Sequence, residues 1–192
     1  MIIRKNYPRP SVEELVRTLS FQNTTSFFIA RHPYERLVSG YVDKVLAGPR
    51  LSKGFAEIAK NIVEKYRKLP PNQYIFGKTI PTFTEFARFI VDESRAGNDL
   101  NDHWKPVYSV CNPCQVNITH IIKFETFNRD TKMILDTVKL SEYLPASGMI
   151  KKNVSPGNTT SYVEMYLNEL PLDLLKDIRD VYKIDFDILG YN

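Results

Sequence analysis

The chain has 192 residues, 43% hydrophobic and 25% charged, which is typical of a globular domain with a sizeable core. It contains no run of about 18 apolar residues, which excludes a transmembrane helix within this sequence. Residues 1–68 carry 13 Lys/Arg and 6 Asp/Glu, whereas residues 69–192 carry 13 and 16. The basic N-terminal part favours an anionic partner, and a solvated basic face is the open alternative.

The first predicted elements are a short helix, a strand and a second helix. The stretch "SVEELVRTL" predicts a helix whose N-cap is Ser11, with Glu14 completing a capping box. Residues 26–30, "SFFIA", predict a buried strand of the parallel type. A helix begins near Pro33, because proline loses nothing in a first helical turn. Its apolar face contains Tyr34, Leu37, Val38, Tyr41 and Val45.

The rest of the chain alternates further helices with one more strand. Periodicity predicts helices over 55–68, 82–94 and 126–140, a strand over 118–125, and a last helix from Pro171. Residues 101–115 and 145–160 read as irregular segments. Two strands that each lead into a helix predict an α/β layer architecture with a parallel sheet. Two strands are few for such a sheet, which indicates that part of it is missing.

The most informative stretch is "IARHPYERLVSGY", residues 29–41. Arg31 stands at the carboxyl end of the first strand, where ligands of parallel sheets collect. The following helix directs N–H groups and its positive end to the same place, and a guanidinium can grip a phosphate with two hydrogen bonds. Ser39, two turns later, adds a hydroxyl, so the pattern predicts a phosphate clamp. The alternative is that Arg31 pairs with a local carboxylate and Ser39 is a surface residue.

A longer stretch, "FFIARHPYERLVSGYVDK", resembles the 3′-phosphate-binding motif of Golgi carbohydrate sulfotransferases, in the group of chondroitin and dermatan 4-O-sulfotransferases. The motif reads Arg-x-Pro-x-x-Arg-Leu-x-Ser-x-Tyr, and its positions are filled by Arg31, Pro33, Arg36, Leu37, Ser39 and Tyr41. The stretches "DHWKPVYSVCNPC", "IIKFET" and "YKIDFDILGYN" are similar to later family blocks in the same order. The resemblance covers roughly residues 26–192.

This resemblance implies a fold and an activity. The fold would be an α/β, parallel-sheet sulfotransferase domain of P-loop-NTPase-like type, mostly helical in this chain. Residues 1–192 would form a single domain that lacks the N-terminal phosphosulfate-binding part. The enzyme would transfer a sulfuryl group from 3′-phosphoadenosine 5′-phosphosulfate to a glycan hydroxyl, with Arg31 and Ser39 holding the nucleotide and no metal required.

The same resemblance implies a partner and a location. The acceptor would be a glycosaminoglycan or a glycoprotein glycan, and no nucleic acid is expected. The full-length protein would be a type II membrane protein of the Golgi lumen, held by an anchor absent from this chain. Asn-x-Ser/Thr sequons agree with a secretory compartment, and they begin at Asn23, Asn117, Asn153 and Asn158.

The histidines offer one candidate catalytic base. Sulfuryl transfer needs a group that takes the acceptor's hydroxyl proton, and His103 in "NDHWKP" is of the right type. Trp104 beside it is a candidate for stacking on a sugar ring. The alternative is a loop histidine next to a core tryptophan. His32 is expected to have no catalytic role, and His120, inside a strand, a structural one.

Four further positions or groups carry open interpretations. Cys111 and Cys114 favour disulfide bonding, while a redox pair and a zinc site remain as alternatives. Glu125 lies near the active cleft or caps the following helix. The basic stretch 151–153 closes over the nucleotide or forms a solvated charge pair.

A rival function belongs to a different class of protein. Because no upstream phosphosulfate loop is found, a non-catalytic glycan- or nucleotide-binding derivative of the same fold stays open. A phosphoryl-transfer enzyme is disfavoured, since neither a G-x-x-x-x-G-K-[ST] loop nor a kinase motif is present.

Overall fold

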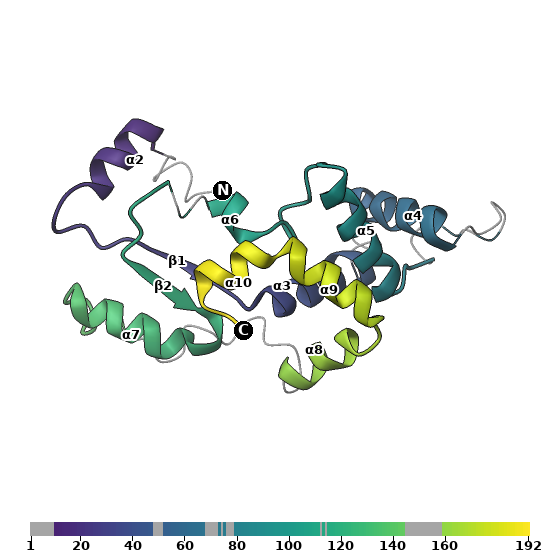
Figure 1. The fold of residues 1–192 in the computed structure, drawn as a ribbon. Coiled ribbons are helices and arrows are strands. Elements are labelled where there is room, and N and C mark those ends of the chain that lie inside the picture. Colours follow the sequence, from purple (N-terminus) through teal and green to yellow (C-terminus); the bar gives the residue numbers. More distant parts are fainter. Residues whose placement is uncertain are drawn as a thin grey trace. The chain divides into compact units, whose positions relative to one another are not determined.

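The structure is a computed structural model that describes residues 10–47, 52–67, 73, 75, 79–111, 113, 115–144 and 159–192. The chain forms two compact units, one of Met1–Ala30 with Cys111–Ile150 and the other of Arg31–Val110 with Lys151–Asn192. Figure 1 shows many helices and a small sheet of two strands. This mixed architecture confirms the α/β class predicted from the sequence.

The first unit contains the sheet, in which β1 (Phe27–Ala30) pairs in parallel with β2 (His120–Lys123). The register places Phe27 opposite His120 and Ala30 opposite Lys123. Ser26 and Thr119 fasten the start of the pair, because each donates its backbone N–H to the hydroxyl of the other, both at 3.0 Å. The parallel direction predicted from two separate strand–helix segments is therefore confirmed.

The prediction that the first strand is buried is wrong for half of its residues. Phe27 and Ile29 are 51% and 50% exposed, whereas Ala30 is 1% exposed. Alternate residues of a strand point to opposite faces, so Phe27 and Ile29 share one face. An apolar run predicts burial on both faces only where layers cover both sides of the sheet, and this face is largely open.

Two helices of the first unit begin with hydrogen bonds between side chains and backbone. Helix α2 (Val12–Leu19) has the predicted capping box, in which Ser11 and Glu14 each accept the other's backbone N–H. After β2, a 3₁₀ turn η4 (Phe124–Thr126) leads into α7 (Phe127–Thr137), which packs against β2 as Figure 1 shows. The carboxylate of Asp130 on α7 accepts the backbone N–H of Lys123 at 3.0 Å and the hydroxyl of Thr126 at 2.6 Å.

The second unit is a packed group of helices. In chain order they are α3 (Pro33–Gly40), the π-helix η1 (Tyr41–Leu46), α4 (Lys53–Arg67), α5 (Phe83–Arg95), α6 (Val107–Cys111), α8 (Thr159–Leu167), α9 (Leu172–Val181) and α10 (Lys183–Leu189). The predicted helices over 55–68 and 82–94 are confirmed as α4 and α5. None of the helices in the described ranges combines the length and apolar character that crossing a bilayer requires.

Aromatic side chains form the centre of the second unit. Tyr41 lies with its ring 5.2 Å from that of Phe83 and 5.4 Å from that of Tyr166, and its hydroxyl donates to the Pro81 carbonyl at 2.9 Å. Burial raises the pKa of Tyr41 to about 12. Four residues of the predicted apolar helix face are buried, namely Leu37, Val38, Tyr41 and Val45. The motif helix is therefore anchored by its apolar face, which leaves its polar side to form a site.

Three parts of the second unit differ from the sequence prediction. The irregular stretch 101–115 contains the short helix α6, and α8 was not foreseen. The single last helix predicted from Pro171 is two helices, because the backbone leaves helical geometry at Tyr182. Tyr182 is 1% exposed and donates its hydroxyl to the carbonyl of Trp104, so this break serves a tertiary contact.

Candidate functional site

The motif helix α3 begins directly after Arg31 with a cap supplied by His32. The Nδ1 atom of His32 accepts the backbone N–H of Tyr34 at 3.2 Å, and Pro33 occupies the first helical turn. The sequence pattern predicts that the first N–H groups of this helix face an anion, and that of Tyr34 is already hydrogen-bonded to His32. This gives His32 a structural role at the start of the motif helix.

The two predicted clamp residues line one small pocket. Arg31, Glu35 and Ser39 follow one another at four-residue spacing, which places them on one side of the helix. The pocket they border has a volume of about 20 Å³, and Tyr162 of α8 contributes to its lining. A space of this size holds about one water molecule, so it accommodates the edge of a ligand rather than a whole nucleotide.

Arg31 also makes the local ion pair that the alternative interpretation foresaw. Its Nε lies 3.1 Å from Oε2 of Glu35, and the two side chains are 23% and 15% exposed. Asp43 lines the same pocket, so Arg31 has two carboxylates nearby. Arg31 thus borders the pocket together with Ser39 and is also paired locally: Glu35 orients the guanidinium, while the negative charges lower the pocket's attraction for an anion.

A π-helical turn follows directly on α3, two residues after Ser39, and contributes to the pocket. In η1 the backbone N–H of Ala47 donates to the carbonyl of Val42 at 3.0 Å, five residues earlier. Val42 and Asp43 of this turn both line the pocket. Single π-turns occur often at functional sites, because the extra residue redirects the side chains around it. The continuous helix predicted from periodicity did not reveal this change.

The neighbouring side of α3 holds the loop that carries His103. Arg36 donates to the backbone carbonyl of Asp102 at 2.6 Å and also to that of Lys105. Gly40 lies so close that a Cβ added there would come 3.1 Å from the carbonyl oxygen of His103. The motif arginine Arg36 and the missing side chain at Gly40 therefore together position this loop.

His103 is exposed on the loop, with its ring centre 5.6 Å from that of Phe55. Partial burial lowers its pKa, and the positive charges of Lys44 and Arg36 lower it further. An imidazole with a lowered pKa is neutral at physiological pH and can accept a proton. His103 does not, however, line the pocket of Arg31 and Ser39.

Two further sequence hypotheses concern Trp104 and Glu125, and burial decides the first of them. Trp104 is 1% exposed and packs edge-on against Phe86 with ring centres 5.2 Å apart, so its suggested stacking on a sugar is wrong. Glu125 lies in the turn η4 after the strand rather than at its end. The carboxylate that joins this turn to α7 is Asp130, whose position within the helix gave no sequence signal.

Other candidate positions lie wholly or partly outside the described residues. Cys111 is exposed at the end of α6, and Cys114 falls outside the described residues, as do Lys151, Lys152 and Asn153. Within the ranges that the structure describes, no group of three or more His, Cys, Asp or Glu side chains is placed to hold a metal ion.

Comparison with known proteins assigns the family. The model of the sulfotransferase family matches residues 4–192, which is nearly the whole chain. The chain belongs to the sulfotransferase family. The motif around Arg31 and Ser39 therefore lies in a sulfotransferase context, and the resemblance to carbohydrate sulfotransferases is confirmed by the names of similar proteins.

Several curated relatives are carbohydrate sulfotransferases. Carbohydrate sulfotransferase 14 of Danio rerio is 30% identical over 168 residues, which cover 86% of this chain and 43% of the relative. Carbohydrate sulfotransferase 12 of Xenopus laevis is 24% identical, covering 90% and 41%, and carbohydrate sulfotransferase 10 of Rattus norvegicus is 31% identical, covering 86% and 46%. The chain thus spans less than half the length of these relatives. No solved structure matches this sulfotransferase chain.

Proposed function

We propose that this protein is a carbohydrate O-sulfotransferase that uses 3′-phosphoadenosine 5′-phosphosulfate as donor. The observation that carries the proposal is the shared pocket of Arg31 and Ser39 on one side of the motif helix. The guanidinium and the hydroxyl both donate hydrogen bonds, as a 3′-phosphate requires. Family membership and the names of the relatives support sulfuryl transfer to a carbohydrate.

In sulfuryl transfer the protein's main roles are to position the two substrates and to stabilise developing charge. The acceptor hydroxyl oxygen attacks sulfur, the bond from sulfur to the 5′-phosphate oxygen breaks, and adenosine 3′,5′-bisphosphate leaves. Holding donor and acceptor in line lowers the barrier, and positive groups stabilise the charge that develops on the leaving phosphate. Arg31 and Ser39 contribute by fixing the nucleotide at its 3′-phosphate.

His103 is the proposed proton acceptor, and its variant has a defined kinetic signature. We expect His103→Ala to lower kcat by about 10²–10⁴-fold while donor affinity stays the same. The base must be neutral to accept a proton, and the pKa of His103 is lowered. As the pH decreases, wild-type kcat/KM should therefore fall only at pH values below the usual pKa range of histidine. This decrease at acidic pH should be absent in the variant. Steady-state kinetics across pH checks both effects.

A second histidine gives the control for that measurement. His120 lies in β2 and its Nδ1 is 2.8 Å from the hydroxyl of Thr119, a local contact. His120→Ala should leave kcat and the pH profile close to those of the wild type. Unchanged turnover in His103→Ala would remove His103 as the base and leave the clamp proposal intact.

The wider properties follow from the same proposal. The acceptor is a glycosaminoglycan or a glycoprotein glycan, and the protein works in the Golgi lumen as a type II membrane protein. The parallel pair β1–β2 is taken as part of a P-loop-NTPase-like sheet. Sequons at Asn23 and Asn117, both on exposed residues, suit a secretory glycoprotein.

A transfer assay tests the function directly. The purified protein is incubated with donor carrying labelled sulfate and with a panel of desulfated glycosaminoglycans and glycoprotein glycans. We expect label on a sugar hydroxyl of at least one acceptor and release of adenosine 3′,5′-bisphosphate. The outcome that contradicts an enzyme is nucleotide or glycan binding without transfer to any acceptor.

That contrary outcome has a specific structural basis. Glu35 and Asp43 place two carboxylates at this pocket, and Arg31 is the one cation that lines it among the residues that the structure describes. Because this charge balance weakens the attraction for an anionic donor, it favours the second candidate, a non-catalytic derivative of the fold, in its glycan-binding form. The assay separates the two functions, because only the enzyme releases bisphosphate in step with label transfer.

A further inference from the structure

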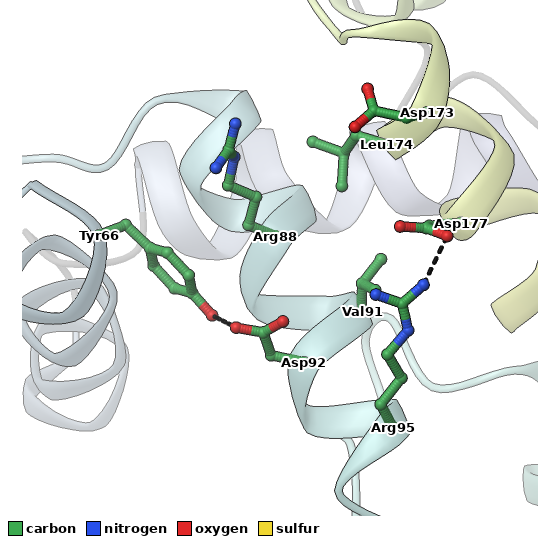
Figure 2. Close-up of a pocket in the computed structure, with 8 residues that line it drawn as sticks. All are labelled: Tyr66, Arg88, Val91, Asp92, Arg95, Asp173, Leu174 and Asp177. Atoms are coloured by element: carbon green, nitrogen blue, oxygen red, sulfur yellow. Dashed lines mark hydrogen bonds and ion pairs between the residues drawn. The ribbon is translucent and has the colours of Figure 1, made fainter.

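A polar pocket of about 210 Å³ lies among α4, α5 and α9 and shares no lining residue with the clamp pocket. One wall is a single face of α5, since Arg88, Val91, Asp92 and Arg95 recur at helical spacing. Figure 2 shows residues of α9 facing this helix from the opposite side. The proposed sulfotransfer chemistry makes no use of this space.

Two contacts hold the walls of the pocket in place. The hydroxyl of Tyr66 on α4 donates to Asp92 at 2.7 Å, and Arg95 pairs with Asp177 of α9 at 2.5 Å. Figure 2 draws both as dashed lines that tie α5 to its neighbours. The pocket is therefore bounded by three helices whose polar side chains are already oriented.

Two other lining residues keep their charges available. Arg88 and Asp173 are exposed at the pocket, and neither has a hydrogen-bond or ion-pair partner within the part of the chain that the structure describes. The two apolar lining residues are buried, because Val91 is 2% exposed and Leu174 is 6% exposed. A ligand here therefore meets mainly polar groups, among them the donor-only Arg88 and the acceptor-only Asp173.

The charges decide the class of ligand. Three carboxylates line the pocket and would repel an anion, while two guanidinium groups would repel a metal ion. A neutral hydroxyl suits both signs, because it accepts from a guanidinium through its oxygen and donates to a carboxylate through its hydrogen.

The geometry points to a second carbohydrate-binding site, in which Arg88 and Asp173 bind the hydroxyl groups of one neutral sugar unit. The volume is below the roughly 300–1,000 Å³ of sites for drug-sized ligands, which suits a single ring of a longer glycan. The choice of a sugar over other polyols rests on the proposed function. This site binds the acceptor glycan away from the clamp.

Titration of the isotope-labelled chain tests this site. The probes are the methyl glycosides of galactose, mannose, N-acetylglucosamine and N-acetylgalactosamine, with sodium sulfate and magnesium chloride as ionic competitors. We expect amide shifts in α5 and α9 with at least one glycoside, and about tenfold or greater weakening in both Arg88→Met and Asp173→Asn. Lys176→Ala, on α9 but outside the lining, is the matched control and should bind like the wild type.

Several results overturn the site without touching the proposed function. The first is the absence of amide shifts with every glycoside. The second is glycoside binding in both variants that equals that of the wild type. The third is amide shifts in α5 and α9 with sulfate or magnesium alone. The two proposals separate in one further comparison. Arg88→Met should retain wild-type affinity for adenosine 3′,5′-bisphosphate, whereas Arg31→Ala should retain wild-type binding of the glycoside.

Discussion

Arg31→Ala is expected to weaken the binding of adenosine 3′,5′-bisphosphate by about 2–5 kcal/mol, the usual range for losing one partner of a buried charge contact. The guanidinium lines the pocket with Ser39 and is held by Glu35 through Nε at 3.1 Å. Its removal takes away the fixed positive charge and leaves Glu35 and Asp43 facing the ligand. Isothermal titration calorimetry of wild type and variant measures the change.

Two further variants, Ser39→Ala and Arg17→Ala, serve as comparisons for that experiment. Ser39→Ala removes one hydrogen bond to a charged group and should lower the affinity by about 1.5–3 kcal/mol. Arg17→Ala, on the exposed helix α2, removes an equal charge outside the pocket and should change the affinity little. If Arg31→Ala binds the bisphosphate as tightly as Arg17→Ala does, the clamp is wrong and Arg31 has a structural role such as its ion pair with Glu35.

In the proposed clamp, the affinity for the nucleotide would reflect competition at Arg31. A bound phosphate and the Glu35 carboxylate both accept from the same guanidinium and repel each other. The pocket volume of about 20 Å³ leaves room for little more than a water, so the phosphate also displaces side chains as it enters. A clamp of this kind trades affinity for orientation, because Glu35 holds the guanidinium in one direction before the nucleotide arrives.

Local signals predicted much of the fold. The capping box of Ser11 and Glu14 marked the start of α2, and Thr82 with Glu85 forms the same device at α5. The apolar periodicity after Pro33 identified the buried face of the motif helix. These features are encoded within a few residues, so a sequence shows them without knowledge of distant contacts.

Features that depend on distant partners were not predicted. The helix α6 begins where Asp185 accepts two backbone N–H groups, 77 and 78 residues away in sequence. The break after α9 occurs where Tyr182 reaches the carbonyl of Trp104, and the side chain of Trp104 is buried by Phe86. The clamp shows the same division: the motif identified Arg31 and Ser39, but Tyr162 of α8 became a lining residue only through folding.

Asp185→Ala is expected to destabilise the fold by about 2–4 kcal/mol, because it leaves two backbone donors without an acceptor. The carboxylate of Asp185 is 1% exposed and accepts the N–H of Val107 at 2.7 Å and that of Tyr108 at 2.8 Å. Burial raises the pKa of Asp185, and these N–H groups oppose that rise. Removing the buried carboxylate also removes the cost of its desolvation. The loss of stability is therefore smaller than the sum expected for two unsatisfied backbone donors.

A neighbouring aspartate on the same helix supplies the control. Asp187 is exposed and pairs only with Lys183 among the described residues, one turn earlier on α10. Asp187→Ala should change the free energy of unfolding by no more than about 0.5 kcal/mol, as exposed ion pairs contribute little. Urea unfolding of both variants measures the difference at one pH. Equal stability of the two variants would show that α6 does not depend on the Asp185 carboxylate.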